Sequence, residues 1–165
     1  MRAAAWIAAV LLAANCTGGD ETVIFNDRPA IARIAIVNQD YVVLRPVSTV
    51  AAPGASSAKV YEDTVYFQPS DRILDLRHLD LRTAKVDQHG GRSVVLLYTT
   101  NDGDRLLHDW TSAHINERLG IFVDGKLTSA PVIKTPINDM IVIDGDFTKA
   151  QAETIVSRLQ KGGTP

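Results

Sequence analysis

The feature that most constrains the fold is a two-residue turn, Asp124-Gly125, between two apolar segments. The flanking segments are Leu119–Val123 and Leu127–Ile133. Asp-Gly favours a tight turn in which both residues have left-handed backbone, and between apolar segments it is the strongest short-range signal for a β-hairpin. The sequence therefore predicts an antiparallel pair of strands.

A second hairpin is predicted upstream of this one. The strands Thr83–Gln88 and Arg92–Thr100 are joined by His89-Gly90-Gly91, a sequence rich in turn residues. Val94–Leu97 is a continuous apolar run, which is typical of a central strand covered on both faces. Met140–Asp144 is predicted to be a further strand.

Two amphipathic helices are predicted in the same half of the chain. Asn101 or Asp102 can cap the first helix, and Thr148 with Gln151 forms a capping box at the start of the second, which Gly162-Gly163 ends. The apolar residues recur at helical spacing. They are Leu106, Trp110 and Ala113 in the first helix, and Ala152, Ile155, Val156 and Leu159 in the second.

The resulting order, ββαβββα, predicts an α+β fold with a mostly antiparallel sheet and both helices on one face, compatible with a ferredoxin-like core. Upstream, the Val- and Ile-rich segments predict short strands, and the small residues 51–58 predict a linker and a subdomain boundary. We therefore expect a signal peptide over 1–16, a β segment with linker over 17–58 and an α+β domain over 59–165. The upstream strands are Val23–Phe25, Ile31–Val37 and Tyr41–Leu44, followed by a hairpin of Lys59–Tyr61 and Thr64–Gln68.

The N-terminus predicts export. Arg2 precedes the apolar run Ala3–Ala14, which is too short to span a bilayer but matches a secretory signal peptide. Cys16 directly follows Leu12-Ala13-Ala14-Asn15 and resembles the lipid-attachment cysteine of the bacterial lipoprotein lipobox, although Asn15 stands where a smaller residue is usual. We expect a lipid-anchored protein on the periplasmic side of the envelope. The alternative is an ordinary cleaved signal with an incidental cysteine.

Composition excludes several classes of protein. The 165 residues include 17 basic and 19 acidic side chains, a formal charge of -2, which argues against a nucleic-acid module. A single cysteine excludes an intramolecular disulfide and a multi-cysteine zinc site. We expect no cofactor and no metal.

Candidate catalytic residues are few. His108 and His114 lie six residues apart, on nearly opposite faces of one helix, and Ser129 has no histidine near it in sequence. Asp144-Gly145-Asp146 fails the calcium-loop pattern, because the sixth and twelfth positions are not Gly and Glu. The alternating Asp and Arg residues between positions 71 and 82 indicate a solvated charged surface. We predict a protein that is not an enzyme, with an envelope hydrolase built from scattered Asp and His residues as a rival.

The segment 119–163 resembles the head of the first periplasmic domain of SecD, a subunit of the bacterial Sec protein-export machinery. The family pattern is an apolar strand, V-x-D-G-x-x-x-S-A-P-x-I, a proline-containing turn, a strand ending near I-x-G-x-F-T, and a helix. A looser likeness extends back to Val60. The matching residues here are Val123, Asp124, Gly125, Ser129, Ala130, Pro131, Ile133, Gly145, Phe147 and Thr148.

The resemblance implies a fold and a contact surface, since none of these residues is a plausible acid, base or nucleophile. It implies Sec translocon components or polypeptide in transit as partners, with the membrane reached through the lipid anchor. An exposed edge at Leu127–Ile133 could take up a strand of polypeptide. The alternative is a stand-alone lipoprotein that reuses the fold for an unrelated ligand or a structural role in the envelope.

Overall fold

The computed structural model describes residues 36–164. The predicted signal peptide, Cys16 and the strand Val23–Phe25 lie outside these residues. Of the predicted strand Ile31–Val37 only Ile36 and Val37 are described, and neither belongs to a strand.

The described chain forms an α+β fold in which every strand pair is antiparallel, as predicted. From β4 onward the order of elements is ββαβββα, which confirms the sequence reading. The elements are β1 (Val42–Val47), β2 (Ser56–Val60), β3 (Asp63–Phe67), the short 3-10 helix η1 (Leu76–His78), β4 (Leu79–His89), β5 (Arg92–Thr99), α1 (Asn101–Ala113), β6 (Arg118–Val123), β7 (Lys126–Ser129), β8 (Met140–Phe147) and α2 (Lys149–Gln160).

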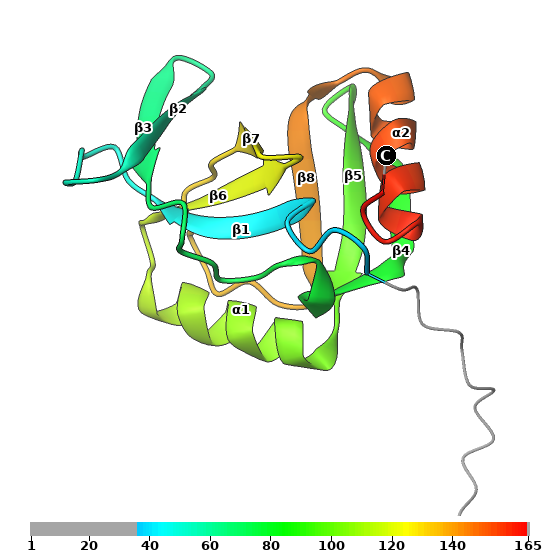
Figure 1. The fold of residues 1–165 in the computed structure, drawn as a ribbon, viewed down its shortest axis with the longest axis horizontal. Helices are drawn as coiled ribbons and strands as arrows, with labels where there is room; N and C mark the ends of the chain where they lie inside the picture. The colour runs from blue at the N-terminus through cyan, green and yellow to red at the C-terminus, as the bar shows by residue number, and fades with distance from the viewer. Residues whose placement is uncertain (1–35, 165) are drawn as a thin grey trace, which may run out of the picture. The chain divides into compact units, whose positions relative to one another are not determined.

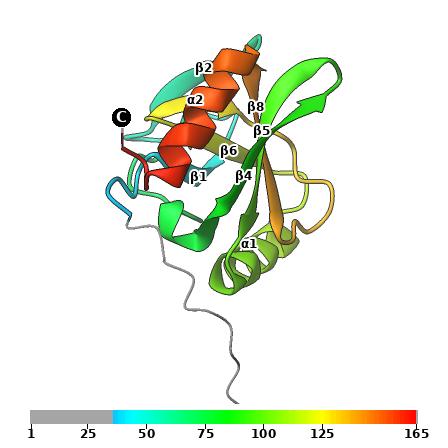
Figure 2. The ribbon, with the colours of Figure 1, turned by 90° about the vertical axis from the view of Figure 1, so that its right-hand side faces the viewer.

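The strands form three sheets where the sequence predicted one. Their orders are β1-β6-β7, β2-β3 and β4-β5-β8 (Figure 1). Helix α2 lies against one face of the β4-β5-β8 sheet (Figure 2), whereas α1 runs below the ends of its strands. The two helices therefore occupy different sides of the core.

One large hydrophobic core joins both three-stranded sheets to both helices. Burial of such side chains supplies most of the stabilisation, at about 25 cal/mol per Å² of apolar surface. Buried members include Leu44 of β1, Ile121 of β6, Val95 and Leu97 of β5, Ile141 and Ile143 of β8, Leu107 of α1, and Ala152, Ile155 and Leu159 of α2.

A smaller cluster covers the other face of β6. Phe122 packs edge-to-face on Phe67 of β3 with 4.7 Å between ring centroids, and Val65 is fully buried beside them. The β2-β3 hairpin therefore covers β6 from outside. The predicted central strand Val94–Leu97 does lie in the middle of its sheet, but Leu96 points away from the core and is only half-buried.

The predicted subdomain boundary at 51–58 is wrong. Strand β1, which precedes it, pairs with β6 from Val42 opposite Val123 to Val47 opposite Arg118, and the described residues 36–164 fall within one compact unit. Part of the expected linker is itself strand β2. The small residues did indicate a loop, but pairing between strands so far apart in sequence leaves no local signal.

Helix α1 begins one or two residues earlier than predicted; Leu106 and Trp110 of the predicted stripe do pack against the core, but other residues are the most buried. Its cap is Thr100, whose side chain accepts a hydrogen bond from the Gly103 amide at 3.2 Å. The buried residues are Gly103, Leu107 and Thr111, whereas Ala113 is exposed. A Cβ on Gly103 would lie 3.0 Å from the carbonyl carbon of His78 and closer still to its oxygen. This close approach brings the Gly103 face inward.

Candidate functional site

The Asp-Gly turn joins β6 and β7 and is held from two sides. Asp124 and Gly125 both have left-handed backbone, with φ of 51° and 73°, as the predicted turn requires. The Asp124 amide donates to the carbonyl of Tyr41 at 2.8 Å, and its carboxylate accepts from Arg158 of α2 at 3.0 Å. The turn is thus tied to the start of β1 and to the last turn of α2.

Arg158 has a second partner in this cluster. Its guanidinium lies 5.3 Å from the centre of the Tyr41 ring. Burial raises the pKa of the Tyr41 phenol, and a hydrogen bond from Arg158 offsets only part of that rise. The Arg158 guanidinium is therefore paired with Asp124 and stacked on the Tyr41 ring, so its role is to stabilise the fold.

The Ser-Ala-Pro segment ends β7 early. β7 stops at Ser129, and beyond it only an isolated bridge joins Val132 to Arg118. Proline has no amide hydrogen to donate, so Pro131 interrupts the ladder that was predicted to run to Ile133. The Ser129 hydroxyl is buried and has no hydrogen-bond partner, while Ala130 belongs to the smaller cluster and Ile133 to the main core.

The third part of the motif shapes the turn from β8 into α2. A Cβ on Gly145 would lie 2.6 Å from the ring of Phe147, so this glycine makes room for the aromatic side chain. Thr148 and Gln151 form the predicted capping box, with the Gln151 side chain accepting from the Thr148 amide at 2.8 Å. The motif residues are thus spread over the β6-β7 hairpin and the β8-α2 junction.

His108 of α1 and His114, the residue directly after α1, both contact neighbouring polar groups. The Nδ1 atom of His108 lies 2.6 Å from the side-chain oxygen of Asn138. The Nδ1 atom of His114 lies 2.6 Å from the backbone carbonyl oxygen of Trp110, and the His114 ring stacks on the Trp110 ring. Among residues 36–164, no three His, Cys, Asp or Glu side chains are placed to hold a metal ion.

The Asp and Arg residues near η1 form ion pairs, but one of them is not on the solvated surface that was expected. Asp75 is only 2% exposed and accepts hydrogen bonds from the backbone and side chain of Arg77. Burial alone would raise the pKa of Asp75, but these hydrogen bonds and the nearby His78 hold it below its ordinary value. The carboxylate caps η1.

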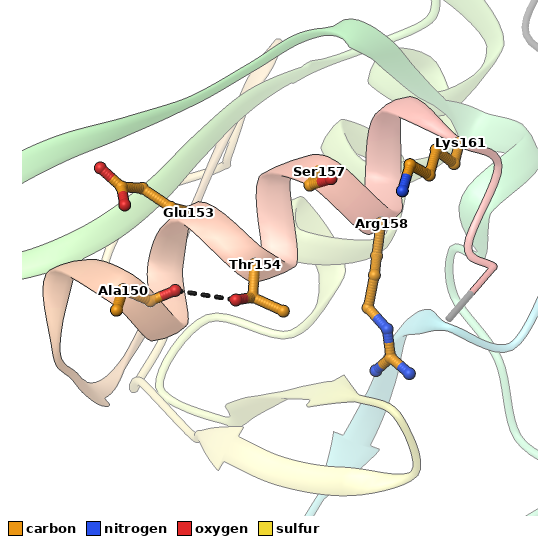
Figure 3. Close-up of a pocket in the computed structure, with 6 residues that line it drawn as sticks. All are labelled: Ala150, Glu153, Thr154, Ser157, Arg158 and Lys161. Carbon is orange, nitrogen blue, oxygen red and sulfur yellow. Dashed lines mark hydrogen bonds between the residues drawn. The ribbon is translucent and has the colours of Figure 1, made fainter.

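An open hollow of about 470 Å³ runs along the outer side of α2 (Figure 3). Every lining residue comes from α2 or, for Lys161, from the residue that directly follows it, and Arg158 near the C-terminal end of the helix is already paired with Asp124. Nothing in this lining selects a particular ligand. The residues are Ala150, Glu153, Thr154, Ser157, Arg158 and Lys161.

Comparison with known proteins identifies the fold. Residues 55–165 match the family described as the SecDF P1 head subdomain. The chain belongs to this family. The match begins after β1, although β1 completes the sheet that holds the motif hairpin.

Relatives of this SecDF head are protein translocase subunits. Protein translocase subunit SecD of Koribacter versatilis is 36% identical over 119 residues, which cover 71% of this chain and 22% of that protein. SecD of Dictyoglomus turgidum is 34% identical over 87 residues, which cover 52% of this chain and 22% of that protein. The chain thus spans about a fifth of the length of these relatives.

Solved structures of SecDF share the fold. A structure described as that of SecDF, a membrane component that enhances protein export, superposes with a TM-score of 0.56 at 21% identity, covering 74% of this chain and 62% of that one. SecDF in a super-membrane-facing form gives 0.53 at 22% identity, covering 74% and 19%. Within residues 36–164, neither helix has the length and apolar character needed to cross a membrane.

Sequence reasoning missed the residues that hold the Asp124 turn. Tyr41 and Arg158, which anchor the Asp124 turn, lie 83 residues before and 34 residues after it. The only local signals were a Val-rich segment after Tyr41 and a basic residue in the last turn of a helix.

Proposed function

We propose that this chain is a non-enzymatic head module that works on the periplasmic side of the envelope in protein export or envelope assembly. Membership of the SecDF P1 head family carries the proposal. Its relatives are named as translocase subunits, and a structural neighbour is described as enhancing protein export. The module acts by contacting polypeptides or other envelope proteins.

The partners expected from this reading are Sec translocon components or polypeptide in transit. Crosslinking in living cells, with a tag at the C-terminus and identification of the captured proteins, tests this directly. Recovery of Sec components or preproteins supports an export role. Recovery of unrelated envelope proteins alone would show that the fold serves another purpose.

Strand β7 is one candidate contact. It is the outermost strand of the β1-β6-β7 sheet, and the pairings between described strands use only the edge that faces β6. An extended polypeptide adds to such an edge through main-chain hydrogen bonds, with little dependence on its sequence. A variant in which residues 119–133 are shortened to remove the hairpin should lose partners; unchanged capture would refute this contact.

The proposed anchor is a lipid on Cys16, which lies outside the described residues. Stable anchoring needs more than one acyl chain, because a single chain gives only marginal binding. We expect the native chain to fractionate with membranes and to incorporate labelled fatty acid. Cys16→Ser should release it into the soluble periplasmic fraction; if this variant stays on membranes and the parent takes up no label, the anchor is absent.

The alternative is a stand-alone lipoprotein that uses the fold for an unrelated ligand or a structural role. A complete SecD with its own head in the same cell, together with capture of no Sec component, would support this alternative.

A further inference from the structure

The outer face of the β4-β5-β8 sheet carries a group of exposed apolar side chains. On the inner face, Val95, Leu97, Ile141 and Ile143 belong to the main core. Successive side chains of a strand point to opposite faces, so the residues next to these along β5 and β8 point outward. Tyr98 is 40% exposed, and Met140 and Val142 are each 38% exposed, with Leu96 half-buried beside them.

These four side chains, called here the outer apolar patch, form two cross-strand pairs. Leu96 lies opposite Val142, and Tyr98 lies opposite Met140. The two pairs are separated by two residues along each strand, about 7 Å at the usual rise. Side chains on one side of any extended polypeptide have the same spacing. A segment of about four or five extended residues would therefore cover the outer apolar patch.

A charged border runs along one side of the outer apolar patch. On β4, Lys85 lies opposite Leu96, and Asp80, which is paired with Arg82 at 2.9 Å, lies opposite Tyr98. This border holds both signs of charge, so it favours neither acidic nor basic partners. It also limits the apolar area to two strands.

The size of the outer apolar patch decides between possible occupants. A stable interface with a second folded protein, including a second copy of this chain, uses about 20–30 residues on each side. Four side chains inside a charged border fall well short of that number. They match a short apolar stretch of an unfolded chain. Methionine, which is flexible and polarisable, is common on surfaces that accept varied partners.

We propose that the outer apolar patch binds short, extended apolar stretches of unfolded polypeptide. This inference rests on the proposed function and gives that function a ligand class and a surface distinct from the β7 edge. Binding through so few side chains is weak and depends little on the order of residues in the partner. Such contacts suit a polypeptide that must slide past without being held.

Photo-crosslinking of the full chain in cells tests the assignment at single residues. A photoreactive phenylalanine analogue replaces Tyr98 in one strain and Tyr61 in another, and a tagged secretory protein is arrested in transit by a folded C-terminal domain. Tyr61, at the β2-β3 turn, is 61% exposed and is therefore more accessible to a passing polypeptide than Tyr98. We expect the arrested chain to crosslink to position 98 and not to position 61. Equal capture at both positions would overturn the proposal.

Binding in solution provides the second measurement. The full-length protein in detergent is titrated with a reduced, carboxymethylated protein that cannot fold, and fluorescence anisotropy gives the affinity. The variant M140T/V142T keeps β-forming residues while removing apolar surface. We expect about tenfold weaker binding, the change that 1.4 kcal/mol produces. The matched control V50T alters a residue that is 73% exposed elsewhere and should bind like the parent.

The outcomes separate this inference from the proposed function. If the parent binds unfolded chains and M140T/V142T binds equally well, the outer apolar patch is not the site, although polypeptide contact stands. If no position crosslinks and the parent binds no unfolded chain, polypeptide contact itself fails. If M140T/V142T instead abolishes a concentration-dependent dimer seen by sedimentation, the patch belongs to a second copy and the proposal is overturned.

Discussion

Replacing Gly103 with alanine should destabilise the domain, even though alanine is the better helix former. In a helix interior this exchange normally gains about 1 kcal/mol. Here the new Cβ would meet the backbone carbonyl of His78, 3.0 Å from its carbon and closer to its oxygen. Forcing extra atoms into such a site costs about 1–3 kcal/mol, and a backbone neighbour cannot rotate away, so the upper end applies. We expect a net loss of about 2 kcal/mol.

Urea unfolding of the full chain, followed by far-ultraviolet circular dichroism, measures this loss. For a domain of this size it corresponds to a fall in melting temperature of about 6 °C. Ser112→Ala, on the exposed face of the same helix, is the matched control and should change the free energy of unfolding by less than about 0.5 kcal/mol. A G103A variant as stable as the parent, or more stable, would mean that α1 does not dock on His78 and that the described orientation of the helix is wrong.

Three further predictions follow from the site geometry. Asp124→Val should cost about 1–2 kcal/mol in urea unfolding because a β-branched residue tolerates a φ of 51° poorly, whereas Asp124→Gly should cost less. Thr148→Ala should cost about 1 kcal/mol through loss of the α2 cap, with Thr154→Ala on the exposed side of the helix nearly neutral; equal losses would refute the cap. The lowered pKa of Asp75 adds stability that is present above the ordinary carboxyl pKa of 3.8 and is lost as pH falls through the lower folded-state value. The unfolding midpoint of the parent should therefore fall more than that of Asp75→Asn between about pH 5 and pH 2, and parallel curves would contradict the assignment.

Local chemistry was sufficient to predict the hairpins and the second helix. Asp124-Gly125 needs left-handed backbone and adopts it, and Thr148 with Gln151 forms the expected capping box. These features depend on residues within four positions of each other, so the sequence expresses them directly. The SecD resemblance was carried by the same local motifs, which is why the family could be named before the fold was known.

The helix α1 shows where local reading fails. Its apolar spacing favours a face containing Leu106 and Trp110, which pack against the core but stay partly exposed, whereas the fully buried positions are Leu107 and Thr111. The deciding contact is between Gly103 and the carbonyl of His78, 25 residues earlier. From sequence alone, a glycine in a helix is expected to lower the stability of the helix. Only the packed structure shows that the missing side chain of Gly103 lets two backbone segments approach each other.

The sequence by itself determined the order of elements, their turns and caps, and the family to which the chain belongs. Tertiary structure alone decided that β1 joins β6, that the strands separate into three sheets, and that Leu96, Tyr98, Met140 and Val142 meet on one outward face. The physical reason is the range of the interactions. Turns and caps are made by neighbouring residues, whereas strand pairing and the choice of the face that remains outside depend on side chains brought together only when the whole core closes.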